Sequence, residues 1–125
     1  MKRTFTLLLL AGIFASFTSL FGIEDVVASL KSGNVSQIAK YFDKTVEIAL
    51  PDKSSSYSKS QAEMILRDFL GKKNIKSFQV LHKGDNGGAQ FCIGRLVTQA
   101  ASYRTTVFMK QKGDKLVLQE IRFEN

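Results

Sequence analysis

Residues 78–123 read FQVLHKGDNGGAQFCIGRLVTQAASYRTTVFMKQKGDKLVLQEIRF, and this stretch decides the fold of the chain. Apolar and polar side chains alternate along four segments of it, as they do in β-strands whose two faces differ. Short turns separate the segments, among them Gly113-Asp114, a residue pair that suits a tight hairpin. We therefore expect four consecutive antiparallel strands, at about residues 77–83, 89–99, 103–112 and 115–123.

The residues before this sheet predict helices and one further strand. Apolar residues recur at helical spacing in residues 23–30 and 35–42, so two short helices are expected to meet at a corner. Residues 45–50 alternate as a strand that Pro51 ends, and residues 52–57 predict a polar loop at the rim of a cavity. Ser58 and Gln61 fit a capping box at the start of a longer helix, which ends at Gly71.

The first 22 residues are typical of a signal peptide. Lys2 and Arg3 precede an apolar run at residues 5–15, which is too short to span a membrane. Small residues follow, so we expect cleavage between Ser16 and Gly22, with an uncleaved N-terminal anchor as the alternative. The domain is then a single unit from residue 23 to residue 125, because the chain is long enough for one domain and not for two.

Export is expected to end in the periplasm or outside the cell. The signal region has no cysteine, so a lipid anchor is not expected, and neither is a membrane span after signal cleavage. The single cysteine, Cys92, cannot form an internal disulfide, and its apolar neighbours predict a buried thiol. The formal net charge of +7 is spread along the chain without a basic stripe interleaved with aromatic residues, which argues against nucleic-acid binding.

Both faces of the predicted strands carry apolar residues. A sheet covered on one side alternates more cleanly than this one does. The apolar residues that break the alternation are Leu81, Cys92, Leu96, Phe108 and Leu118. We therefore expect the second face to be partly buried by a homodimer formed through the sheet.

The order of the elements resembles a known superfold. Helix, helix, strand, helix and four antiparallel strands is similar to the nuclear transport factor 2-like fold, also called ketosteroid-isomerase-like or cystatin-like. This is an α+β fold in which a curved sheet wraps around a helix as a cone. More narrowly, the chain resembles a family of small exported proteins of unknown function from Bacteroidota-type bacteria. The segments that carry this likeness are residues 31–34, 39–43, 57–63, 78–82 with Gly84, 93–94 and 96–98.

The resemblance implies a ligand pocket at the open end of the cone but no activity, because this superfold serves many functions. The candidate pocket residues are Tyr41, Tyr57, His82, Arg95 and Tyr103. His82, the only histidine, could act as acid or base, or be a plain rim residue beside a turn. Arg95 could face the pocket and pair with Glu47 or Glu120, or lie in solvent. The tyrosines could present hydroxyls to a cavity or pack in the core or rim.

Reactive groups do not form a recognisable catalytic set. The isomerases of this superfold place an aspartate and a tyrosine on the inner walls of the cone, and no inward aspartate is evident in these strands. The residues Gly84 to Gly88 are not followed by Lys-Ser/Thr and join two strands, so they indicate a hairpin turn and not a phosphate site. One histidine and one cysteine without clustered acids predict no metal site, and no catalytic residue or cofactor is expected.

Three functions remain open from the sequence. The first is a non-enzymatic module that binds a small apolar or amphipathic ligand in the cone, or a partner protein at the sheet. The second is a lyase, isomerase or hydrolase of the ketosteroid-isomerase kind. The third is a dimeric structural or interaction module. The sequence leans away from an enzyme, and it identifies neither the ligand nor the strand face that lines the cavity.

Overall fold

The structure is a computed structural model that describes residues 21–125. The predicted signal peptide therefore lies almost wholly outside the described residues. The elements are α2 (Phe21–Ser32), α3 (Val35–Ala39), β1 (Phe42–Ala49), β2 (Ser54–Ser58), α4 (Lys59–Gly71), β3 (Ile75–Asn86), β4 (Ala89–Thr98), β5 (Ser102–Lys112) and β6 (Lys115–Glu124). Within residues 21–125, no helix is both long and apolar enough to cross a membrane.

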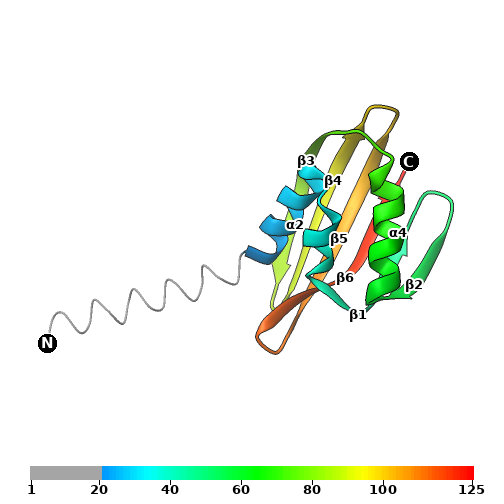
Figure 1. Cartoon of the computed structure of the whole chain (residues 1–125). Helices are drawn as coiled ribbons and strands as arrows, with labels where there is room; N and C mark the ends of the chain where they lie inside the picture. The colour runs from blue at the N-terminus through cyan, green and yellow to red at the C-terminus, as the bar shows by residue number, and fades with distance from the viewer. Residues whose placement is uncertain (1–20) are drawn as a thin grey trace, which may run out of the picture.

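The strands form one six-stranded sheet in the order β2-β1-β6-β5-β4-β3. All neighbouring pairs are antiparallel except β1 and β6, which run parallel. The hairpin of β1 and β2 forms one edge, and α4 then crosses the sheet to β3 at the opposite edge (Figure 1). The four strands of residues 75–124 return across the sheet as a meander, so β6 meets β1.

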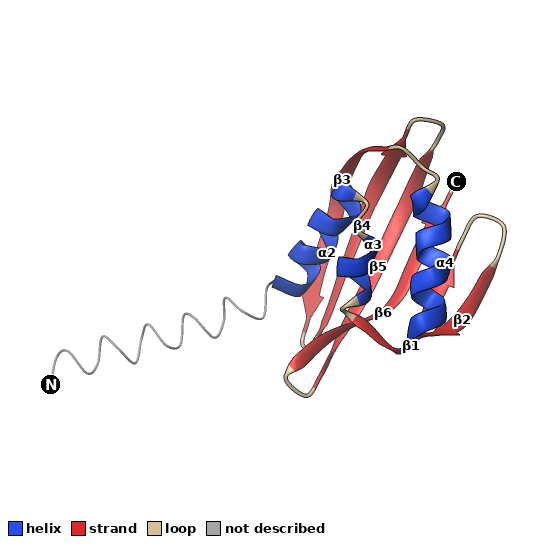
Figure 2. Cartoon of the chain, viewed as in Figure 1, coloured by secondary structure: helices blue, strands red, loops and turns tan. Residues whose placement is uncertain are grey.

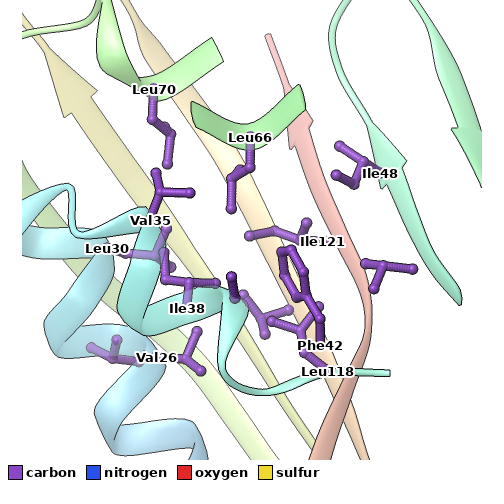
Figure 3. Packing of buried hydrophobic residues seen from close by; sticks show 14 of the residues in the cluster. Val26, Leu30, Val35, Ile38, Phe42, Ile48, Leu66, Leu70, Leu118 and Ile121 are labelled. Carbon is purple, nitrogen blue, oxygen red and sulfur yellow. The ribbon is translucent and has the colours of Figure 1, made fainter. Parts of the chain in front are cut away.

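All three helices cover the same face of the sheet (Figure 2). We call this the helix face and the opposite one the outer face. Leu66 and Leu70 of α4 point toward the side chains of α3 and β6 (Figure 3). The fully buried side chains on or under the helices include Leu30, Ile38, Leu66, Leu96, Met109 and Phe123. Burial of apolar surface here supplies the main stabilisation of the fold.

The α+β class and the four-strand meander agree with the sequence prediction, and two local expectations are wrong. The second helix was expected over residues 35–42, whereas α3 ends at Ala39 and Phe42 begins β1. Residues 52–57 were expected to be a polar loop, whereas Ser54–Ser58 form strand β2, paired with β1. Serine has no strong strand preference, and this edge strand is mostly exposed. The backbone pairing with β1, and the inward packing of Tyr57 opposite Val46, hold it in place.

The predicted ends of α4 are confirmed, and capping features also occur around α3. The Asn34 side chain accepts a hydrogen bond of 3.2 Å from the backbone N–H of Gln37 at the start of α3. Ser58 and Gln61 form the reciprocal capping box of α4. Gly33, which joins α2 to α3, has φ of +71°, a conformation that a side chain would strain.

A second glycine, Gly94, allows β3 and β4 to pack closely in the core. A Cβ added to Gly94 of β4 would lie 2.4 Å from the Phe78 ring and 2.7 Å from the backbone oxygen of Gln79. Phe78 is buried on the helix face, so its ring occupies the space that a side chain at position 94 would take. The neighbouring β3 and β4 can pack this closely only with glycine there.

We predict that Leu66→Ala lowers the free energy of unfolding by about 2–5 kcal/mol, because it leaves a cavity under α4. Leu66 is fully buried, whereas Met64 on the same helix is 70% exposed. Met64→Ala is the matched control and should change stability by less than about 0.5 kcal/mol. Urea unfolding of the two variants makes the comparison, and equal losses would show that α4 does not pack as described.

Candidate functional site

The outer face of the sheet carries two like-charged pairs and an apolar centre. Register along β3 to β6 and β1 defines which side chains are neighbours on it, because alternate residues of each strand point to the same side. Cys92, Gly94 and Leu96 of β4 belong to the helix face, where all three are buried. Phe91, Ile93 and Arg95 therefore belong to the outer face, and their cross-strand partners lie beside them there.

The first pair consists of two arginines. Arg95 of β4 lies directly opposite Arg104 of β5, and both side chains are exposed. On its other side Arg95 faces Gln79 of β3. Within the part of the chain that the structure describes, neither guanidinium forms an ion pair. Of the two alternatives left open for Arg95, the structure has the one in solvent, because Glu47 and Glu120 lie on β1 and β6, which are not neighbours of β4.

The second pair consists of two glutamates. Glu47 of β1 lies opposite Glu120 of β6 in the parallel register. Burial raises the pKa of Glu120, and the neighbouring Glu47 carboxyl raises it further through its charge and a hydrogen bond between the two. Arg122 opposes this shift, with its Nη1 atom 3.6 Å from an oxygen of Glu120. The same arginine approaches Glu124 at 3.8 Å, so it is shared between two carboxylates.

The centre of the outer face is apolar. Phe91 and Phe108 are cross-strand neighbours, and Ile93 lies opposite Thr106 in the next row of the same two strands. All four side chains are partly exposed. Aromatic and β-branched cross-strand neighbours stabilise a sheet. Here they also leave apolar area open to solvent between the arginine pair and the glutamate pair.

Next to the arginine pair the surface is hollowed. An open depression of about 320 Å³ is lined by Leu81, Gly94, Arg95, Ser102, Tyr103, Arg104 and Asn125. Leu81 is 54% exposed and lies at a bulge, where the register of β3 against β4 shifts between Val80 and His82. A depression with two guanidinium groups at its wall suits carboxylate groups of a partner.

The bulge also changes the place of His82. Strict alternation would place His82 on the same strand face as Phe78 and Val80, but the extra residue reverses the alternation after Val80. Lys83 then pairs with Cys92, and its ammonium forms an ion pair with Glu24 of α2 on the helix side. His82 is exposed, and its ring lies 5.4 Å from the ring of Phe91 on the outer face.

The three candidate tyrosines lie apart from one another. The hydroxyl of Tyr41, just before β1, donates a hydrogen bond of 2.5 Å to Asp25 of α2. Burial, this bond and the charge of Asp25 raise the pKa of Tyr41 to about 12. Asp25 also accepts a bond of 2.8 Å from Gln37, so its carboxylate joins α2 to α3 and to the start of β1. Tyr41 is thus held in a structural contact.

The other two tyrosines pack at the edge of the core. Tyr57 lies opposite Val46 and contacts the buried cluster from β2. Tyr103 stacks edge-on with Phe69 of α4 at 5.5 Å, and the ammonium of Lys73 lies 4.1 Å from the Phe69 ring. Of the candidate pocket residues, the structure brings together Arg95 and Tyr103, which share the depression, and leaves Tyr41, Tyr57 and His82 elsewhere.

Cys92 fits the expectation of a plain buried thiol. It is fully buried on the helix face and forms no disulfide. Burial raises the pKa of the thiol, so its reactive thiolate form is disfavoured. Within residues 21–125, no three metal-binding side chains of the His, Cys, Asp and Glu type come together.

The sequence reasoning missed both like-charged pairs. The arginine pair could have been predicted from the sequence, because the short turn between β4 and β5 fixes which residues of these two strands face each other. The glutamate pair had none, because β1 and β6 are far apart in the chain and pair in parallel. Asp43 was also passed over, although it accepts bonds from Lys112 at 2.8 Å and Gln119 at 3.1 Å.

The family of the chain follows from comparison with known proteins. A family model described as a domain of unknown function, DUF4783, matches residues 23–124. The chain belongs to the DUF4783 family. A DUF4783 family protein from Bacteroides uniformis is 29% identical and has a TM-score of 0.78, with 82% of this chain and 94% of that chain covered. One from Bacteroides ovatus is 25% identical with a TM-score of 0.77, over 81% of this chain and 92% of that chain.

More distant structures support the fold alone. An NTF-2 like protein of unknown function from Burkholderia xenovorans is 12% identical, with a TM-score of 0.64 over 83% of this chain and 80% of that chain. This DUF4783 protein therefore has a nuclear transport factor 2-like fold with a curved sheet, as the order of its elements predicted. The chain matches no curated protein.

We predict a pH dependence of stability from Asp43 of this DUF4783 chain. Its bonds to Lys112, Gln119 and the backbone of Lys44 lower the pKa of Asp43 to about 2. The ionised form is therefore favoured by folding, and its contribution is present above the unfolded pKa of about 3.9. Asp43→Asn should cost about 1 kcal/mol at pH 7, and the loss should fade between about pH 4 and pH 2.

The control for this prediction is Asp52→Asn. Asp52 is an exposed aspartate in the turn between β1 and β2. Thermal unfolding from pH 2 to pH 7 should show little difference between this variant and the parent protein at any pH. A loss in Asp43→Asn that is the same at pH 2 and pH 7 would mean that the charge of Asp43 does not contribute.

Proposed function

We propose that this protein is an exported, non-enzymatic binding module that receives a protein partner on the outer face of its sheet. The observation that carries the proposal is the difference between the two faces. Side chains of α2, α3 and α4 fill the helix face with fully buried residues, whereas the outer face presents partly exposed Phe91, Ile93 and Phe108. Aromatic groups at a half-open surface favour contact with a partner.

The small-ligand version of the module has weaker support. It needs a cavity inside the cone, and the position of such a cavity is occupied by Leu30, Ile38 and Leu66, which are fully buried against the sheet. The depression beside Arg95 lies on the surface and not in the cone. A protein partner uses such a surface directly, because interfaces combine apolar and aromatic centres with polar rims.

The enzyme alternative has weaker support than the binding module. A ketosteroid-isomerase-like site needs at least two of His82, Arg95, Tyr41, Tyr57 and Glu47 to converge within hydrogen-bond reach in one cavity. Within the described residues no hydrogen bond joins any two of them, and the Tyr41 hydroxyl is engaged by Asp25. A binding role for the outer face does not require these five residues to lie together.

The proposal that the protein is exported rests on its N-terminal residues alone. Lys2 and Arg3 before an apolar run, with small residues up to Gly22, fit a cleavable signal peptide. An exported domain that has Cys92 as its single cysteine gains no stability from an internal disulfide. The large buried core under the helices meets that need.

The test is site-specific photo-crosslinking in cells that produce the full chain. A crosslinking amino acid replaces Thr106 at the centre of the outer face or, as control, Met64 on the exposed side of α4. We expect a covalent adduct of defined mass from position 106 that is at least tenfold more abundant than any from position 64. Adducts of equal abundance at both positions, or none at position 106, would contradict the proposal.

A further inference from the structure

The arginine pair on the outer face has no bound partner of opposite charge among the described residues. Arg95 and Arg104 face each other across β4 and β5, and both side chains are exposed. Within residues 21–125 neither guanidinium forms an ion pair or a hydrogen bond, and neither lies over an aromatic ring. Like charges directly opposite each other in a sheet are destabilising, so an anion bound by both groups would stabilise this part of the sheet.

An acidic residue lies in the same row of the sheet, but its carboxylate is near another arginine. Glu124 of β6 lies directly opposite Arg104, on the side away from Arg95. Its carboxylate lies 3.8 Å from the Nε atom of Arg122 and forms no ion pair with Arg104. Gln79, which faces Arg95 from β3, is uncharged. Two positive charges and one negative charge give this row a net charge of about +1 at neutral pH, and both guanidinium groups of the pair remain open to an external anion.

The depression beside the arginine pair has room for more than a single charged group. It has a volume of about 320 Å³, and Ser102 and Leu81 line it together with the two arginines. Leu81 is 54% exposed at the bulge of β3, so an apolar surface lies next to the guanidinium groups. A side chain with a carboxylate, followed along a peptide by an apolar side chain, would match both parts of this depression.

The position of the depression favours a peptide of a protein partner over a small free anion. Ile93 lies two residues before Arg95 on the same side of β4, and Phe91 lies two residues before Ile93. An extended peptide that places a carboxylate on the arginine pair can therefore continue over the apolar centre of the outer face. A small free anion would leave that apolar centre and Leu81 exposed.

We propose that the protein partner contacts the outer face with an acidic, extended segment, and that Arg95 and Arg104 together bind one aspartate or glutamate carboxylate of this segment. The inference rests on the proposed function and names the chemistry of the partner. A guanidinium group donates two parallel hydrogen bonds to a carboxylate, and two such groups side by side offer donors to both carboxylate oxygens. An apolar residue of the segment, next to the carboxylate, covers Leu81 in the depression.

The first experiment measures peptide binding to the protein purified from cells that produce the full chain. The probe is a dye-labelled peptide with two Glu-Leu repeats between Gly-Ser flanks, and the reference peptide has Gln-Leu repeats in their place. By fluorescence anisotropy in about 50 mM salt, we expect the Glu-Leu peptide to bind at least about tenfold more tightly than the reference. Arg95→Gln with Arg104→Gln should abolish this preference, because no guanidinium group then meets the carboxylate.

The matched control is Lys53→Gln with Lys59→Gln, which removes the same charge from the side of the sheet that carries α4. Both lysines are exposed, and neither forms an ion pair within residues 21–125. This variant should keep the preference for the Glu-Leu peptide. Thermal unfolding should show the arginine variant to be at least as stable as the parent protein, because a like-charged pair is removed. Equal binding of the two peptides by the parent protein, or an equal loss of the preference in both variants, would overturn the inference.

Crosslinking in cells separates this inference from the proposed function. The adduct at position 106 should be at least about fivefold less abundant when Arg95→Gln and Arg104→Gln are present, and its crosslinked segment should contain aspartate or glutamate. An adduct whose abundance does not depend on the two arginines would overturn the inference and leave the outer face as a binding surface. No adduct at position 106, together with a preference for the Glu-Leu peptide in the purified protein, would overturn the proposed function and its named partner and leave only a carboxylate site at the arginine pair.

Discussion

The contact between α4 and the sheet is the one on which the rest of the structure depends. Leu66 and Leu70 lie under α4 and are almost completely buried against α3, β6 and their neighbours. Because α4 connects β2 at one edge to β3 at the other, its burial determines which face becomes the core. Every outer-face position follows from that choice, since a strand that buries Cys92 and Leu96 must expose Arg95.

As a consequence, the side chains that stabilise the fold lie on the helix face, whereas the exposed charged and aromatic side chains lie on the outer face. Hydrogen-bonded polar groups on the helix side, such as Asp25 with Tyr41, hold elements together and leave few free functional groups there. The outer face instead combines partly exposed aromatic side chains with two like-charged pairs, Arg95 with Arg104 and Glu47 with Glu120. Surfaces of this kind gain from association, because a partner both covers apolar area and supplies the missing charge.

Much of the fold was predictable from the sequence, and the reasons are local. Alternation in residues 78–123 and the capping box at Ser58 are short-range signals, and the structure agrees with them. Strand β2 was missed because its serines carry no strand preference and its pairing depends on β1. The direction of His82 depended on a bulge, and the neighbours of Arg95 and Glu47 depended on register between strands. Register and bulges are set by tertiary packing, so composition and periodicity do not reveal them.

The central claim is that a protein partner covers the outer face while the exposed side of α4 stays open. Hydroxyl-radical labelling of the purified protein and of the protein inside the cells that produce it tests this directly, residue by residue. The account predicts that labelling of Phe91 and Phe108 is lower in the cells than in the purified protein, whereas labelling of Met64, which is 70% exposed, is the same in both. Equal labelling of the two phenylalanines in both samples, or an equal fall at Met64, would contradict it.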